Sequence, residues 1–270
     1  LSKNTKNVLK VNERLSTGLR LNHASDDAAG LSISERLTSQ IQGLNRAASN
    51  AQDGISLLQI TEGALSTMVE NLQRIREITV QAASDTYSST ERQAVKGEVK
   101  ARIADIQMTK DATQFNKITL LDGTVSSYIL RVGANADTAT NTLDISGALI
   151  NTLAQFLSTD TTTGALSNAF ADGDGARAFL GKIDDALKNI LNQRSTLGAL
   201  QSRLESTIVN LQISEENYSA ANSRIKDIDI ANATADSTKY QILQQASVSI
   251  LSQTNQLPSI AISLLQSSMG

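Results

Sequence analysis

The chain has 270 residues, with 24 Lys and Arg against 27 Asp and Glu, so its formal net charge is −3. This balance argues against a general binder of nucleic acid, because neutralising phosphates requires an excess of basic residues. The chain has no uninterrupted run of about 18 apolar residues, the length that a membrane-spanning helix needs. The absence of Cys excludes disulfides and thiolate chemistry. Only 3% of the residues are aromatic, so a core must be packed with aliphatic side chains.

The first 22 residues have the apolar spacing of an amphipathic helix. Val8, Val11, Leu15 and Leu19 recur three and four positions apart. Residues 22–30 are small and acidic instead, which predicts a connector. We expect Ser25 or Asp26 to cap the helix that follows.

Two long segments, residues 31–83 and 179–225, carry the heptad spacing of helices that pack along a seam. Their seam residues are Leu37, Ile41, Leu44, Ala48, Ala51, Ile55 and Leu58 in the first, and Phe179, Ile183, Ala186, Ile190, Leu197, Leu200, Leu204, Ile208 and Leu211 in the second. Helices this long need partner helices of similar length. With further helices at 89–112 and 238–265, we expect a mainly α fold. It is a long antiparallel helical bundle or coiled coil that pairs the N- and C-terminal segments.

The middle of the chain carries β signals. Ile118–Asp122 is apolar and β-branched, and Asp122-Gly123 predicts a hairpin turn. Residues 128–133 alternate as a half-buried strand does, and residues 142–145 are a weaker second strand. The following segment, rich in Ala, Thr, Asp, Asn and Gly, predicts a surface excursion with a helix around Ala148–Leu157.

The sequence offers little material for catalysis or metal binding. His23 is the single His, which excludes a site with two His ligands. It lies in a polar connector, where a solvated side chain is a simpler interpretation than the base of a Ser-His-Asp triad. Asp26 and Asp27 fit helix capping, and Asp172–Gly175 lacks the Glu that a calcium loop needs further on. We expect no enzyme, no metal and no cofactor.

Several short segments at both ends of the chain resemble the signatures of bacterial flagellins. They are Glu13–Asn22, Asp26–Gly30, Asn50–Ile55, Thr61–Leu65 and Thr113–Asn116 in the first half, and Ser214–Asn217, Ser223–Asp229 and Gln253–Pro258 in the second. Each segment alone is a weak signal. Together, in family order, they resemble the flagellin family over nearly the whole chain.

The resemblance implies a domain organisation. Residues 1–30 and 224–270 are expected to form a terminal helical domain in the inner tube of a filament. Residues 31–133 and 179–223 are expected to form a helical core domain with a β-hairpin, and residues 134–178 a short variable surface region. Family members normally carry several more apolar helical turns ahead of the position of Leu1, so we expect an N-terminal piece to be missing and polymerisation to suffer.

The resemblance also implies a function and partners. The chain is expected to polymerise with other flagellin subunits into the extracellular flagellar filament that serves motility. It is expected to leave the cell unfolded through the flagellar export machinery, with a chaperone and without a cleavable signal peptide. The alternative is a cell-surface homologue that acts as an adhesin or polysaccharide receptor. An intracellular coiled-coil scaffold fits the flagellin-like segments less well.

Two sets of residues are candidate contact sites. Gln73, Arg74 and Glu77 lie off the seam of Leu72 and Ile75 and predict an exposed polar ridge, for which a solvated helix face is the simpler interpretation. The resemblance implies subunit packing and recognition by the flagellin-sensing Toll-like receptor at Leu72, Gln73, Arg74, Glu77, Ile78 and Asp105. It implies roles in polymerisation for Leu15, Leu19, Ile250 and Leu257.

Overall fold

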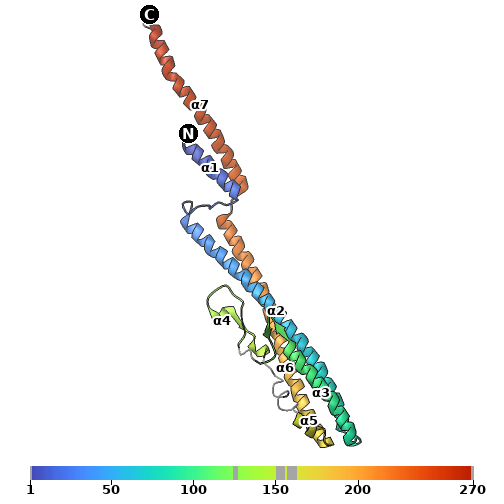
Figure 1. Ribbon diagram of the computed structural model, residues 1–270. Coiled ribbons are helices and arrows are strands. Elements are labelled where there is room, and N and C mark those ends of the chain that lie inside the picture. Colours follow the sequence, from blue (N-terminus) through green and yellow to red (C-terminus); the bar gives the residue numbers. More distant parts are fainter. Residues whose placement is uncertain (1, 124–126, 150–155, 157–162, 269–270) are drawn as a thin grey trace. The chain divides into compact units, whose positions relative to one another are not determined.

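The computed structural model describes residues 2–123, 127–149, 156 and 163–268. The chain is mainly α, as predicted (Figure 1). The long helices are α1 (Ser2–Thr17), α2 (Ala28–Ala82), α3 (Ser89–Ala112), α6 (Gly173–Lys226) and α7 (Ile230–Ser268). Two short helices, α4 (Thr138–Asn141) and α5 (Thr163–Ala169), and a 3-10 turn at Ser146–Ala148 lie between α3 and α6 in the sequence.

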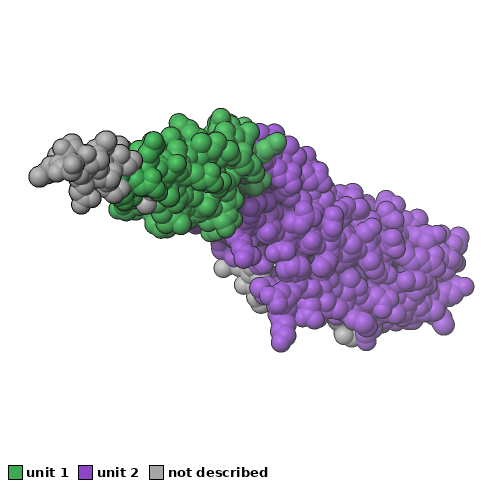
Figure 2. Space-filling model, turned by 90° about the horizontal axis from the view of Figure 1, so that it is seen from above, with its two compact units in different colours: residues 1–42, 215–270 green, residues 43–214 purple. Residues whose placement is uncertain are grey.

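The chain divides into two compact units, shown in different colours in Figure 2. One contains residues 1–42 and 215–270, and the other contains residues 43–214. The long helices α2 and α6 contribute residues to both. In the described part of the chain, every helix is too short or too polar to cross a bilayer.

In the unit of residues 43–214, α2, α3 and α6 pack around one apolar core. The guanidinium of Arg76 on α2 lies 2.6 Å from the carboxylate of Asp184 on α6, whereas Gly54 lies beside Leu204. Early residues of α2 thus meet late residues of α6, which confirms the antiparallel pairing predicted from the heptads. The fully buried core residues include Leu58, Leu72, Ile75, Ile106, Ile183 and Leu197. Their burial supplies the main driving force for this fold.

The turn between α2 and α3 is held by side chains that satisfy helix ends. The Ser88 backbone N–H donates to Glu91 Oε2 at 2.7 Å, and the Glu91 N–H donates to Ser88 Oγ, which forms a capping box for α3. The buried Arg92 donates to the carbonyls of Ala82 and Ser84 at 3.0 and 3.1 Å, which closes the C-terminal end of α2. The predicted helix at residues 89–112 is confirmed.

The hairpin turn lies at a different place from the predicted one. Strands β1 (Gln114–Phe115) and β2 (Ile118–Thr119) pair antiparallel. The residues between them, Asn116 and Lys117, have φ angles of 49° and 66°. Two-residue turns of this kind need positive φ at both positions, and Asn adopts such angles readily. The prediction of the turn at Asp122-Gly123 is therefore wrong.

A second two-stranded sheet is formed by β3 (Ile129–Arg131) and β4 (Thr142–Asp144), which pair antiparallel with Leu130 opposite Leu143. These strands confirm the two strand predictions and are slightly shorter. The helix predicted around Ala148–Leu157 falls mostly outside the described residues.

In the unit of residues 1–42 and 215–270, α1 lies alongside α7 (Figure 1). Helix α1 ends at Thr17 rather than at residue 22, because Gly18 adopts a φ of 72° that stops the helix. Helix α7 begins at Ile230 rather than at residue 238, because the Asp229 carboxylate accepts hydrogen bonds from the Ala231 and Asn232 N–H groups.

The cap of α2 also differs from the prediction. Asp27, not Ser25 or Asp26, accepts the Gly30 N–H at 2.9 Å. Asp26 turns instead to α1, where Lys10 Nζ lies 2.5 Å from its carboxylate. The hydrogen bond from Lys10 holds the pKa of Asp26 below its ordinary value.

Candidate functional site

The predicted polar ridge on α2 is exposed in the structure. Gln73, Arg74 and Glu77 all face solvent. Arg74 Nη1 lies 2.6 Å from Glu77 Oε2, and Arg74 Nε lies 3.0 Å from Glu98 Oε1 on α3. The hydrogen bonds to Glu77 and then Glu98 raise the pKa of Arg74 above its ordinary value. The ridge therefore extends across two helices.

Glu98 is a member of this ridge that sequence reasoning missed. Its place follows from the antiparallel register of α2 and α3, which also brings Arg102 Nη1 to 3.2 Å from Asn71 Oδ1. Folding the two predicted helices about the turn at residues 83–88 would have placed Glu98 opposite Arg74.

The segment from Leu72 to Ile78 has two faces. Leu72 is 0% exposed and Ile78 is 3% exposed, and both belong to the core of α2, α3 and α6. Within the subunit they hold α2 in place and present no surface. Any contact made by this segment falls to the exposed ridge residues between them.

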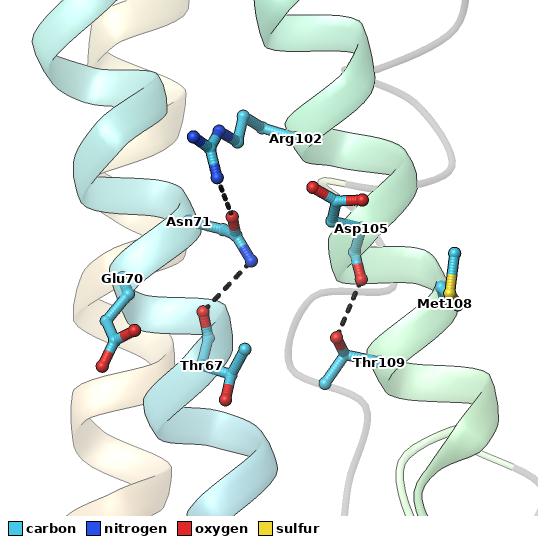
Figure 3. A pocket seen from close by; sticks show the side chains of 7 residues that line it. All are labelled: Thr67, Glu70, Asn71, Arg102, Asp105, Met108 and Thr109. Carbon is cyan, nitrogen blue, oxygen red and sulfur yellow. Dashed lines mark hydrogen bonds between the residues drawn. The ribbon is translucent and has the colours of Figure 1, made fainter.

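Asp105 lies on a groove between α2 and α3 (Figure 3). The groove has a volume of about 410 Å³ and is lined by Thr67, Glu70, Asn71, Arg102, Asp105, Met108 and Thr109. It mixes the carboxylates of Glu70 and Asp105 with a guanidinium and the exposed Met108. The lining contains neither His nor Cys.

The four residues predicted to support polymerisation fall into different environments. Leu15 and Leu19 are half-buried, and Leu19 forms a single β-bridge with Asp227. Ile250 on α7 is 63% exposed. The side chain of Leu257 lies outside the described ones, although its backbone belongs to α7.

One side of α7 exposes apolar residues at helical spacing. Ile242, Leu243, Ala246 and Ile250 are all exposed, and we call them the apolar flank of α7. The polar residue Asn255 is exposed on the opposite side of the same helix. Contiguous exposed apolar side chains at this spacing mark a surface that binds a partner.

The acidic residues considered for cation binding have structural partners. Asp172 Oδ1 accepts the Gly175 N–H at 2.7 Å at the start of α6. His23 is exposed and lies 3.5 Å from Glu13. Among the described residues, no three His, Cys, Asp or Glu side chains gather as metal ligands would.

Comparisons with known proteins place the chain beside flagellar proteins. The bacterial flagellin N-terminal helical region matches residues 1–126, and the bacterial flagellin C-terminal helical region matches residues 180–265. A flagellin of Halalkalibacterium halodurans is 42% identical over 257 residues, which cover 95% of this chain and 91% of the relative. The flagellar filament 33 kDa core protein of Treponema phagedenis is 39% identical over 271 residues, covering 96% and 92%.

Solved structures include a similar fold. The crystal structure of Bacillus cereus flagellin has a TM-score of 0.50 and 27% sequence identity with this chain. The match covers 60% of this chain and 88% of that one.

Proposed function

Because this chain belongs to the bacterial flagellin family, we propose that it is a structural subunit that polymerises into the flagellar filament. The observation that carries the proposal beyond family membership is the apolar flank of α7, where Ile242 is 60% and Ile250 is 63% exposed. Burying apolar surface contributes about 25 cal/mol per Å². Neighbouring subunits bury this flank, and the gain is repeated at every subunit of a filament.

The internal packing of α1 and α7 supports this proposal. Helix α1 has no buried residue. Of the α7 residues with described side chains, Ala233 and Ser237 alone are buried. The pair therefore gains little from its own apolar contacts, and neighbouring subunits supply the rest. Nothing in the comparisons favours the adhesin.

The polar ridge is the proposed contact of the other unit. Gln73, Arg74, Glu77 and Glu98 pack against a neighbouring subunit in the filament. Arg74 suits this role because its planar guanidinium can bind a carboxylate with two hydrogen bonds. We also propose that the flagellin-sensing Toll-like receptor binds the same exposed side chains. It would do so on the free subunit, in which no neighbouring subunit covers the ridge.

The remaining family expectations are part of the same proposal. The terminal helical domain of residues 1–30 and 224–270 lines the inner tube, and the subunit reaches the cell exterior through the flagellar export machinery. The chain acts by assembly rather than by catalysis, a proposal supported by its membership of a family of structural proteins.

A matched pair of substitutions on α7 tests the assembly proposal. Ile250→Asp places a charge on the apolar flank, whereas Asn255→Asp places the same charge on the opposite side of the same helix. We expect the first variant of the full-length chain to stay in the supernatant after sedimentation under conditions that pellet the parent, and the second to pellet with the parent. Normal pelleting of Ile250→Asp would contradict the proposal.

A further inference from the structure

Polar side chains bond α1 to α7 across their contact. Three hydrogen bonds cross between the helices: Ser237 Oγ donates to Asn12 Oδ1 at 3.1 Å, Gln244 Nε2 donates to Thr5 Oγ1 at 3.3 Å, and Asn4 Nδ2 donates to Ser247 Oγ at 3.3 Å. We call these three pairs the polar ladder. On α7 its members follow the seven- and three-residue spacing of one helix side. Gln241 adds a bond to Ser237 at 3.3 Å from within α7.

This arrangement departs from the usual amphipathic pair, in which apolar side chains fill the seam between the helices. Here the polar ladder shares the seam with the half-buried Val8, Val11 and Leu15 of α1. Ser237 is 6% exposed and belongs to the ladder, while Ile242 and Leu243 of the apolar flank face outward. A polar residue in a helix seam contributes less stability than an apolar one. It specifies register and partner, because a mispaired polar group loses its hydrogen bond.

The sequence around the ladder penalises slippage in both directions. In the observed register Asn12 faces Ser237 and Thr5 faces Gln244. A slip of one heptad, about 10.5 Å along the axis, would bring Thr5 opposite Leu251. The opposite slip would bring Asn12 opposite Ile230. Either slip leaves a ladder residue against an apolar side chain with no hydrogen-bond partner.

We infer that the polar ladder fixes the register of α1 against α7 of its own chain, and so fixes how the apolar flank is presented to neighbouring subunits. The inference rests on the proposed function, since the flank matters only where subunits assemble. The ladder supplies specificity, and the flank supplies the free energy of assembly. If the apolar flank packed between α1 and α7 instead, the same side chains would be needed both to pair these helices and to bind neighbouring subunits.

Disulfide trapping can test the register because the chain has no native Cys. The in-register reporter is Asn4→Cys with Ser247→Cys, which replaces the last rung. The slipped reporter is Val11→Cys with Ser247→Cys, which meets only after a slip of one heptad. Each reporter is oxidised in the assembled full-length chain. A denaturing gel then separates cross-links within one chain from those between chains.

Two ladder variants are compared with the parent. The apolar variant carries Thr5→Val, Asn12→Leu, Ser237→Leu and Gln244→Leu, and removes the two remaining rungs. The exchanged variant carries Thr5→Gln, Asn12→Ser, Ser237→Asn and Gln244→Thr, and keeps both rungs with their side chains swapped between helices. Filament formation is scored separately by electron microscopy, so a parent that never assembles contradicts the proposed function rather than the register inference.

In the parent and the exchanged variant we expect the in-register cross-link within one chain to exceed the slipped one at least about tenfold. In the apolar variant we expect the two reporters to cross-link to similar extents, or cross-links between chains to appear. An apolar variant that fails to assemble while the exchanged variant assembles in register also supports the inference. The inference is overturned if the apolar variant keeps the register of the parent, or if the exchanged variant loses it.

Discussion

The guanidinium of Arg74 on α2 reaches the carboxylate of Glu98 on α3, with 3.0 Å between Nε and Oε1. Both side chains are more than 40% exposed, so solvent and salt screen their attraction. The pair is available to a neighbouring subunit without being needed for the fold of its own.

We predict that Arg74→Ala leaves the thermal midpoint of the monomer unchanged but raises the protein concentration needed for assembly. Arg76→Ala is the matched control, because the side chain of Arg76 also reaches from α2 to another helix, where it forms an exposed ion pair with Asp184 on α6. Thermal melting and sedimentation of both variants provide the measurement. Assembly of Arg74→Ala at the parent's concentration would leave the ridge as a solvated helix face.

The apolar core predicts a large effect at Leu197 on α6. Leu197 is 0% exposed, so Leu197→Ala removes buried methyl groups and leaves a cavity, which costs about 2–5 kcal/mol of unfolding free energy. Leu191→Ala, on the same helix at 51% exposure, is expected to change stability by less than about 0.5 kcal/mol. Urea unfolding followed by circular dichroism gives both values. Equal losses would show that α6 does not pack as described.

The capping box of α3 predicts a pH-dependent contribution to stability. The N–H of Ser88 donates to the Glu91 carboxylate and lowers its pKa from 4.5. A depressed carboxyl pKa contributes stability above the unfolded pKa, and this contribution is lost as pH falls through the folded pKa. Glu91→Ala should therefore destabilise the chain at pH 7. The difference should shrink as pH falls below 4.5 and vanish once the pH lies below the lowered pKa of the folded state.

Gln93→Ala, an exposed change in the same turn that removes no charge, is the control for this titration. Its effect on stability should be the same at both pH values. A Glu91→Ala penalty that persists at low pH would mean that the carboxylate does not cap the helix.

The turn between β1 and β2 predicts a stabilising substitution. Lys117 has a φ of 66°, an angle that is unfavourable for a residue with a Cβ atom. Lys117→Gly creates the Asn-Gly sequence that such turns prefer, and we expect it to raise stability by up to about 1 kcal/mol. Lys117→Val, which is stiffer at this angle, should lower it. The urea midpoints of the two variants should move in opposite directions from the parent.

The helices were predictable because their signal is repeated many times along the chain. A seam such as Ala51, Ile55 and Leu58 still predicts a packed helix if one of its positions is misjudged. All three residues are buried in the structure. Such a seam also demands a partner of similar length, which pointed to residues 179–225. The mainly α antiparallel architecture follows from these repeated positions.

Features that depend on a single residue were not predictable in this way. Asp26 and Asp27 are equally good caps in sequence, and the choice between them is made by Lys10, which lies on another helix. Glu98 joins the ridge only through the register of α2 and α3. The turn at Asn116 and Lys117 lacks Gly, so the neighbouring Asp122-Gly123 gave the stronger signal.

A three-dimensional reconstruction of the assembled full-length chain by electron microscopy tests the central claim most directly. We expect filaments in which the apolar flank of α7, Ile242, Leu243, Ala246 and Ile250, is buried between neighbouring subunits. A chain that stays monomeric under every condition that assembles its flagellin relatives, or filaments in which this flank faces solvent, would contradict it.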